Sequence, residues 1–219
     1  MKINYVQMKT WIISLFLLAG YISLQAQESQ PVDGARKESM LQQIGRTAAS
    51  LKTMQCDFEQ TKYLSLLNDK MVSRGRMYYK QEYLLRWEYH TPYRYIFILN
   101  DTKVILKSTR QKEVIDVKSS RLFQEIVRIM MSSVTGKCLT EDNDFQVTLY
   151  SEGKEWIARL VPRKKEMKQM FRTITLHFCP ERSMVSEIEM TEQSGDITRI
   201  VLTNVQANQA IDEKVFTLD

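Results

Sequence analysis

Few residues of this 219-residue sequence have the chemistry of a catalytic or metal-binding group. The candidates are two histidines and three cysteines, namely His90, His177, Cys56, Cys138 and Cys179. None of them forms a CxxC, HExxH or HxxxH pattern, so the sequence predicts no metal site. A nucleophile needs a neighbouring base, often on a Gly-x-Ser-x-Gly turn, and the sequence has no such turn. We therefore expect no catalytic residue, no metal and no cofactor.

Burial explains Cys56 better than reactivity does. Cys56 alternates with Met54 and Phe58 on one face of a predicted strand, which is typical of a small buried hydrophobic residue. Three cysteines allow at most one internal disulfide, and their spacing does not indicate which pair would form it.

The charges are mixed along the chain rather than grouped. Lys and Arg number 31 against 26 Asp and Glu, which gives a formal net charge of +5 without a block of one sign. A nucleic-acid partner is therefore not expected. The hydrophobic share of 43% and the charged share of 26% are typical of a globular protein.

The start of the chain resembles a cleaved export signal. Two lysines and no acid precede an uncharged apolar run at residues 11–24, and Ala26 is a small residue after which we place the cleavage. The run is shorter than the about 20 residues that a helix needs to span a bilayer. We expect residues 1–26 to be a signal peptide and residues 27–219 to form a single exported domain.

Apolar residues spaced by three and four positions predict two longer helices. The first follows Asp33, which is placed to act as its N-cap. The second covers residues 119–136, with a serine as its cap and Gly136 as its end. A charged connector at residues 163–170 is expected to contain one helical turn.

Outside these helices the apolar period changes to two residues, which predicts strands. Short gaps that contain Asn68-Asp69 and Asn100-Asp101 favour hairpins and hence antiparallel pairing. Roughly eleven strands are predicted, from Met54 onward and then at 71–79, 84–89, 93–99, 103–108, 113–117, 145–150, 155–162, 172–178, 184–192, 196–205 and 215–218. A sheet of this size must curl, split or close to bury one face. We thus predict a mainly β (α+β) fold whose helices close the mouth or cover the concave face of the sheet.

Five segments, taken in order, resemble the signature of the LolA family of periplasmic lipoprotein carriers. The stretch from Gly75 to Pro92 contains a Gly-x-hydrophobic strand, a turn, and an Arg-Trp strand that ends in proline. Residues 58–61 read Phe-Glu-Gln-Thr upstream of it, and the hairpin at Asn100-Asp101 lies downstream. The segments 195–204 and 211–218 are similar to the two closing segments of the family. The resemblance covers nearly the whole chain after the export signal.

This resemblance implies an incomplete antiparallel β-barrel, a curved sheet of roughly eleven strands with helices covering its concave apolar face. It also implies a cavity that receives the acyl chains of lipoproteins, in a protein that shuttles them through the periplasm from the inner to the outer membrane. The implied partners are acylated lipoproteins, an inner-membrane ABC transporter that releases lipoproteins, and an outer-membrane acceptor.

One turn departs from the family pattern. Gln81-Glu82 stands where members of the best-studied branch carry Arg-Pro, so the lid latch associated with that arginine is not carried over. A carrier or sensor for another amphiphile, such as a glycolipid or a polyene lipid, is therefore the alternative function. An enzyme at the barrel mouth would need the catalytic groups that the sequence lacks.

A lipid carrier must bind hydrocarbon strongly and still release it. An acyl chain gains about 0.8 kcal/mol per buried CH₂, so about sixteen carbons contribute on the order of 12 kcal/mol. Methionine offers adaptable apolar contacts, and the chain has twelve. We predict that the cavity is lined by Met77, Leu85, Trp87, Tyr89, Tyr95, Phe97, Leu99, Ile126, Ile129, Met130, Ile174, Leu176, Phe178 and Met190, with Met131, Met170 and Met184 as further methionines. The alternative for each of them is ordinary packed core. We also predict that the helix at residues 119–136 opens as a lid.

Overall fold

The computed structural model describes residues 31–81, 84–117, 121–139 and 144–218. The predicted signal peptide at residues 1–26 lies outside the described residues. Among the helices that are described, none is both long and apolar enough to cross a bilayer.

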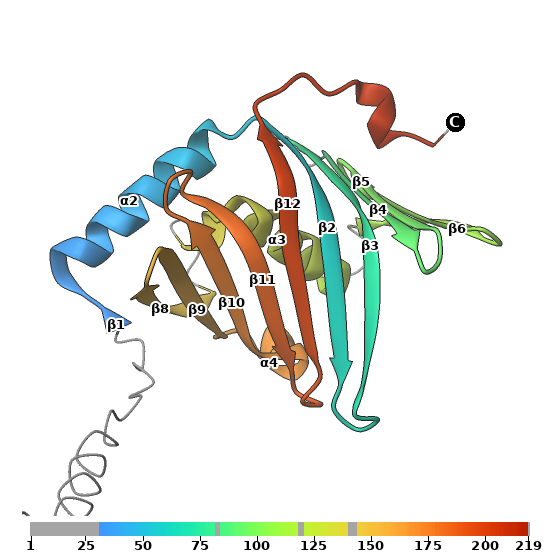
Figure 1. Cartoon of the computed structure of the whole chain (residues 1–219). Coiled ribbons are helices and arrows are strands. Elements are labelled where there is room, and N and C mark those ends of the chain that lie inside the picture. The colour runs from blue at the N-terminus through green and yellow to red at the C-terminus, as the bar shows by residue number, and fades with distance from the viewer. Residues whose placement is uncertain (1–30, 82–83, 118–120, 140–143, 219) are drawn as a thin grey trace, which may run out of the picture.

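The described strands form one antiparallel sheet of twelve strands (Figure 1). Their order is β1-β8-β9-β10-β11-β12-β2-β3-β4-β5-β6-β7, so the sheet runs from an edge at β1 to an edge at β7 without closing. The strands are β1 (Pro31–Val32), β2 (Thr53–Leu64), β3 (Asp69–Lys80), β4 (Leu84–Thr91), β5 (Tyr95–Asn100), β6 (Lys103–Ser108), β7 (Lys112–Asp116), β8 (Phe145–Glu152), β9 (Glu155–Pro162), β10 (Phe171–Cys179), β11 (Met184–Glu192) and β12 (Ile197–Ala207). The prediction of a mainly β fold with an unclosed antiparallel sheet is confirmed.

The helices cover one face of this sheet, which we call the inner face. The described residues form three α-helices and two 3-10 turns, namely α2 (Gly34–Ser50), α3 (Arg121–Thr135), α4 (Lys165–Met170), η2 (Lys137–Leu139) and η3 (Glu213–Phe216). The helix α2 buries Met40, Ile44 and Ala48, which lie on one stripe because they are four residues apart. Both α2 and α3 pack against β11, and Figure 1 shows α3 lying across the sheet.

Alternation along the strands decides which residues reach the inner face. On β2, Met54, Cys56 and Phe58 are buried, whereas the residues between them point to the outer face. There Asp57 pairs with Arg76 of the neighbouring strand at 3.0 Å. The inner side of the sheet is therefore apolar and its outer side is charged.

A glycine in the middle of β3 allows aromatic rings to pack across that strand. Gly75 lies opposite Phe58 on β2 and opposite Tyr89 on β4. A Cβ atom at this position would overlap the Glu88 carbonyl oxygen and lie 2.7 Å from the Phe58 ring. Only glycine lets the aromatic side chains of the two neighbouring strands approach each other here.

The end of the chain differs from the prediction of a strand at residues 215–218, which is wrong. Residues 213–216 form the 3-10 turn η3, and the Asp212 carboxylate caps it by accepting a hydrogen bond from the Lys214 backbone N–H at 2.9 Å. Phe216 is buried, and the Asn100 side chain donates to its carbonyl oxygen at 3.2 Å. The Asp212 cap stabilises the turn locally. Phe216 is the buried side chain of η3, so the segment lacks the alternation of buried and exposed residues that a strand would have.

The predicted helix ends and turns can be compared with the structure at several positions. Asp33 precedes α2 as expected but makes no side-chain cap hydrogen bond, and the serines predicted to cap α3 lie outside the described residues. Gly136 ends α3 with φ +80°, in agreement with the prediction. Asn68 and Asp101 have φ values of +48° and +54°, which confirms the predicted turns at these two positions.

Candidate functional site

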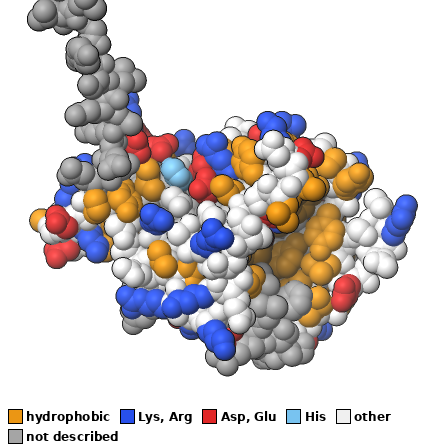
Figure 2. Space-filling view, turned by 90° about the horizontal axis from the view of Figure 1, so that it is seen from below, with side chains coloured by type: hydrophobic (Ala, Val, Ile, Leu, Met, Phe, Trp, Pro, Cys, Tyr) orange, Lys and Arg blue, Asp and Glu red, His pale blue; other side chains and the backbone are white. Residues whose placement is uncertain are grey.

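An apolar cavity of about 270 Å³ lies between α3 and the inner face of the sheet. Seen from below, the molecule has a hollow whose visible lining is hydrophobic (Figure 2). The cavity is lined by residues of β2, β4, β10, β11 and β12 on one side and of α3 and α4 on the other: Gln60, Trp87, Tyr89, Ile129, Met130, Ser133, Val134, Met170, Phe171, Ile188, Met190 and Ile200. Its volume is close to the lower end of the about 300–1,000 Å³ typical of small-molecule pockets.

Strand register explains why these residues share one wall. Gln60 of β2 is paired with Ile200 of β12, and Ile200 is paired with Ile188 of β11. Side chains in register on adjacent antiparallel strands point to the same face, so the three form one row across the sheet. Met190 lies two residues beyond Ile188 and therefore also faces inward.

An aromatic cluster forms the neighbouring part of the wall. The rings of Phe58 and Trp87 are 4.6 Å apart between centroids, and the Tyr89 ring meets Phe58 edge-on at 5.1 Å. Tyr95 extends the cluster, with its ring 6.2 Å from that of Tyr89. These contacts fix the orientation of Trp87 and Tyr89, which both line the cavity.

Polar groups are present inside this apolar lining. The Tyr89 hydroxyl donates a hydrogen bond to the Gln60 side-chain oxygen at 2.9 Å. Burial raises the pKa of Tyr89 to about 12, although the nearby Trp87 and Gln60 side chains partly oppose this shift. The hydroxyl is therefore protonated at neutral pH. The buried Trp87 indole N–H has no hydrogen-bond acceptor among the described residues.

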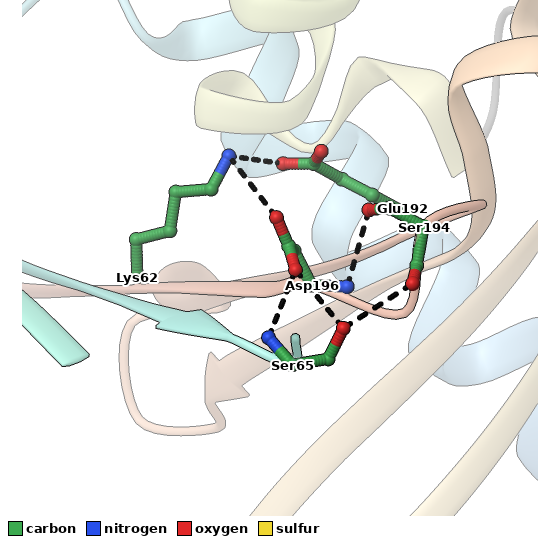
Figure 3. Close-up of polar contacts among 5 residues, drawn as sticks. All are labelled: Lys62, Ser65, Glu192, Ser194 and Asp196. Atoms are coloured by element: carbon green, nitrogen blue, oxygen red, sulfur yellow. Dashed lines mark hydrogen bonds and ion pairs between the residues drawn. The ribbon is translucent and has the colours of Figure 1, made fainter. Parts of the chain in front are cut away.

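A polar cluster lies beyond the cavity, where β2 and β11 end (Figure 3). Lys62, two residues after Gln60, places its ammonium 2.8 Å from the Glu192 carboxylate and 4.0 Å from that of Asp196. The Ser65 backbone N–H donates to the Asp196 carboxylate at 2.9 Å. The cluster thereby joins the turn after β2 to the turn after β11, and it ends the apolar wall on this side.

The structure brings five of the predicted lining residues together at the cavity: Trp87, Tyr89, Ile129, Met130 and Met190. The further methionine Met170 joins them. Tyr95 and Phe97 lie half-buried on β5, next to this group, because their register partners on β4 are Tyr89 and Trp87. The side chain of Ile126 lies outside what the structure describes.

The remaining predicted residues lie in the packed core rather than in the lining of this cavity. They are fully buried members of one apolar core cluster: Met77, Leu85, Leu99, Ile174, Leu176 and Phe178. Their positions fit the alternative of ordinary core packing. The apolar alternation of the strands does not separate these residues from those that face the cavity, since both sets point inward.

Other lining residues were not among the predicted ones: Gln60, Ser133, Val134, Phe171, Ile188 and Ile200. The alternation rule would have found three of them. On β2, Gln60 is the next inward position after Met54, Cys56 and Phe58. On β11, Ile188 precedes Met190 by two positions, and on β12, Ile200 precedes the buried Leu202 by two positions. Gln60 and Ser133 are polar, so a search for apolar side chains omits them.

The candidate chemical groups of the sequence lie elsewhere. Cys56 is 3% exposed, which confirms its interpretation as a buried hydrophobic residue. This burial, with a smaller contribution from Asp57, raises the pKa of its thiol from 9.0 to about 12. His90 lies 3.6 Å from Glu88, and His177 lies 3.2 Å from Glu155. Within the described residues, no group of three His, Cys, Asp or Glu side chains is placed to hold a metal ion.

Comparison with known proteins finds a matching family profile and relatives of similar length. The sequence profile described as outer membrane lipoprotein carrier protein LolA matches residues 49–219. The outer-membrane lipoprotein carrier protein of Methylococcus capsulatus is 27% identical over 171 residues, which cover 76% of this chain and 77% of that protein. The protein of the same name from Pseudomonas fluorescens is 20% identical over 191 residues, which cover 87% and 86% of the two chains.

Solved structures share the fold at low sequence identity. A chain of the Pseudomonas aeruginosa MucA/MucB complex superposes with a TM-score of 0.52 at 11% identity, over 84% of this chain and 62% of that one. This chain thus spans less than two thirds of that protein. An uncharacterized conserved protein from Thermus thermophilus gives a TM-score of 0.51 at 9% identity, over 84% and 94% of the chains. At these identities the likeness concerns the fold alone.

Proposed function

The chain belongs to the LolA family of outer-membrane lipoprotein carrier proteins, and from this premise we propose that it binds the acyl chains of lipoproteins in the cavity under α3. The family is periplasmic and consists of transport proteins rather than enzymes. In our proposal the protein takes acylated lipoproteins from an inner-membrane ABC transporter and delivers them to an outer-membrane acceptor.

The observation that carries this proposal is the apolar space of about 270 Å³ that the protein's own side chains leave unfilled. Protein interiors are normally packed as densely as organic crystals, with few voids larger than a water molecule. Unfilled space between a helix and an apolar sheet face therefore suits a ligand with hydrocarbon chains. The lining supplies Met130, Met170 and Met190, whose unbranched side chains adapt to a mobile chain.

The size of the cavity supports a moving lid. Hydrocarbon gains about 0.8 kcal/mol per buried CH₂, so a carrier gains most when whole chains enter. The existing space is at the lower end for a single small molecule, and a lipoprotein with more than one acyl chain needs more. We propose that α3 moves away from β11 to admit the chains, since α3 supplies Ile129 and Met130 to the side of the cavity opposite the sheet.

Export and domain organisation complete the proposal. Residues 1–26 direct the chain out of the cytoplasm and are removed, and residues 27–219 act as one lipid-binding domain. The support for this is the apolar run that follows two lysines, together with a family match that begins only at residue 49.

A second candidate function is a carrier or sensor for a different amphiphile, such as a glycolipid or a polyene lipid. The observation that favours it is Gln81 at the turn where members of the best-studied branch carry arginine. Under this alternative the cavity and its lid are used in the same way, but the cargo is not a lipoprotein.

A pull-down experiment separates the two candidates. The mature protein is immobilised and offered one lipoprotein in two forms, either acylated or with its acylated cysteine replaced by serine. We expect recovery of the acylated form only. Equal recovery of both forms contradicts the proposal, and recovery of neither form together with a co-purifying glycolipid favours the second candidate.

A further inference from the structure

The cavity contains polar groups that a purely hydrocarbon ligand does not need. Trp87, Tyr89 and Gln60 all line it, and they come from the nearby strands β4 and β2. The Tyr89 hydroxyl donates to the Gln60 side-chain oxygen at 2.9 Å. This bond uses the amide oxygen of Gln60, and its amide N–H groups have no acceptor among the described residues.

Trp87 supplies a second unused donor. Its side chain is 4% exposed, its indole nitrogen is buried, and the described part of the chain offers no acceptor for its N–H. The N–H lies close enough to the Tyr89 hydroxyl to lower the pKa of that phenol, but the two groups do not meet the geometry of a hydrogen bond. A buried donor without a partner is unfavourable, and native proteins rarely retain one without a ligand or water to satisfy it.

The local fold holds these groups together. Tyr89 lies on β4 opposite Gly75 of β3, and Gly75 lies opposite Phe58 of β2. Since Gly75 has no side chain, the Tyr89 ring extends over β3 and reaches Gln60, two residues beyond Phe58. The Phe58 ring packs against both Trp87 and Tyr89 and limits their movement. The donors are therefore placed before any ligand arrives.

These groups select for a particular ligand atom. A CH₂ chain offers no acceptor, whereas a carbonyl oxygen accepts from an indole N–H and from an amide N–H. Acyl chains carry such an oxygen at their ester or amide link, at the end that joins the head group. The wall around the donors, formed by Ile188, Ile200 and Met190, is apolar and suits the chain itself.

From this arrangement we propose that Trp87 and Gln60 bind the carbonyl oxygens of acyl ester or amide links, so that the cavity distinguishes acyl chains from plain alkyl chains. The inference rests on the proposed function, because it assigns the polar part of the same cargo to named side chains. Tyr89 is the positioning residue, since its hydroxyl fixes the orientation of the Gln60 amide.

The test compares two lipopeptides that differ only in the link. One carries two ester-linked palmitoyl chains, and the other carries two ether-linked hexadecyl chains, which lack the carbonyl oxygens. Titration calorimetry with the mature protein gives the ratio of the two Kd values. We expect the ester form to bind about tenfold more tightly, as one buried donor changes from unsatisfied to satisfied.

Three variants locate the effect. Trp87→Phe removes the indole N–H, and Gln60→Leu removes the amide donors at nearly constant size. Each is expected to lower the ester preference, the ratio of the two Kd values, to about twofold or less, and this ratio is compared because a change in the shape of the wall affects both ligands. Trp156→Phe is the matched control, because Trp156 lies on β9 outside the cavity lining, and it should keep the full preference. Thermal unfolding of each variant confirms that it is folded.

The indole proton gives a readout that does not depend on a variant. In a ¹⁵N-labelled protein, the Trp87 indole N–H resonance should move downfield with the ester ligand and less with the ether ligand.

The outcomes separate this inference from the function on which it rests. If both lipopeptides bind the wild type equally, or if Trp87→Phe and Gln60→Leu keep the ester preference, the inference is wrong and the carrier function stands. If neither lipopeptide binds the wild type, the proposed function itself is wrong.

Discussion

Filling the cavity with a larger side chain should block the ligand and leave the protein stable. Ile200 is suited to this test because it lies in the row between Gln60 and Ile188 and faces the cavity. In Ile200→Phe the ring would occupy space that the wild-type protein leaves to the ligand. We expect lipopeptide binding to weaken by at least about tenfold, since buried CH₂ groups of the chain lose their place.

The expected stability follows from the volume of the cavity. At about 24 cal/mol per Å³, an enclosed empty void of about 270 Å³ would cost on the order of 6 kcal/mol. The hollow is open on one side, so the true cost is smaller. A phenylalanine that fills part of it should therefore leave the free energy of unfolding within about 1 kcal/mol of the wild-type value, or increase it.

A matched substitution in the packed core is the control. Ile174 lies on the inner face of the same sheet, but it is fully buried within the core and does not line the cavity. In Ile174→Phe the ring has no free space, so this variant should lose about 1–3 kcal/mol of stability. Urea unfolding gives both stabilities, and titration with the ester-linked lipopeptide gives the Kd of each folded variant.

Two results would refute this reasoning. If Ile200→Phe is destabilised as strongly as Ile174→Phe, the space under α3 is not present in solution. If Ile200→Phe is stable and binds the lipopeptide like the wild type, the space exists but does not hold the acyl chains.

Three further predictions concern the wall and its ionisable groups. Gly75→Ala should lower the free energy of unfolding, measured in urea, by about 3 kcal/mol or more, because its Cβ would overlap the Glu88 carbonyl. Gly153→Ala, in open space at φ +54°, should lower it by only about 1–2 kcal/mol. Similar losses in the two variants would contradict the close packing over β3. In the folded protein, a thiol reagent at about pH 8 should label the half-buried Cys179 well before Cys56, because Cys56 is buried and its raised pKa keeps the thiol protonated. Equal labelling rates of the two cysteines would contradict the burial of Cys56. The pKa values of Cys56 and Tyr89 are raised to about 12 on folding, so their contribution to stability is complete below about pH 9 and is lost as the pH rises toward about 12. The free energy of unfolding of Tyr89→Phe should therefore decline less steeply over this range than that of the wild type.

The strands could be predicted because their signal is local. The bounds of β6, β9 and β11 coincide with the predicted ones, since each is a short run rich in β-branched and other apolar residues. The strand β1 has only two residues, which are too few to show an alternating pattern, and it forms by pairing with the distant strand β8. The C-terminal turn η3 was mistaken for a strand because four residues are too few to distinguish the two periods.

The cavity could be predicted only in part because its position depends on contacts between distant segments. Trp87 and Tyr89 were identified from a motif and a strand face, and they do line the cavity. Leu85 lies on the same face of the same strand, yet it is fully buried in the core. What separates them is where α3 crosses the sheet, and this depends on long-range packing rather than on the sequence near β4.

The central claim is that an acyl chain lies in the space between α3 and the inner face of the sheet. Photo-crosslinking tests it most directly, with a lipopeptide whose palmitoyl chain carries a diazirine near its end and with mass spectrometry to identify the labelled residues. Our account predicts crosslinks to lining residues such as Ile129, Met190 and Ile200, and their loss when unlabelled lipopeptide competes. Crosslinks confined to the charged outer face of the sheet, or crosslinks that persist under competition, would contradict it.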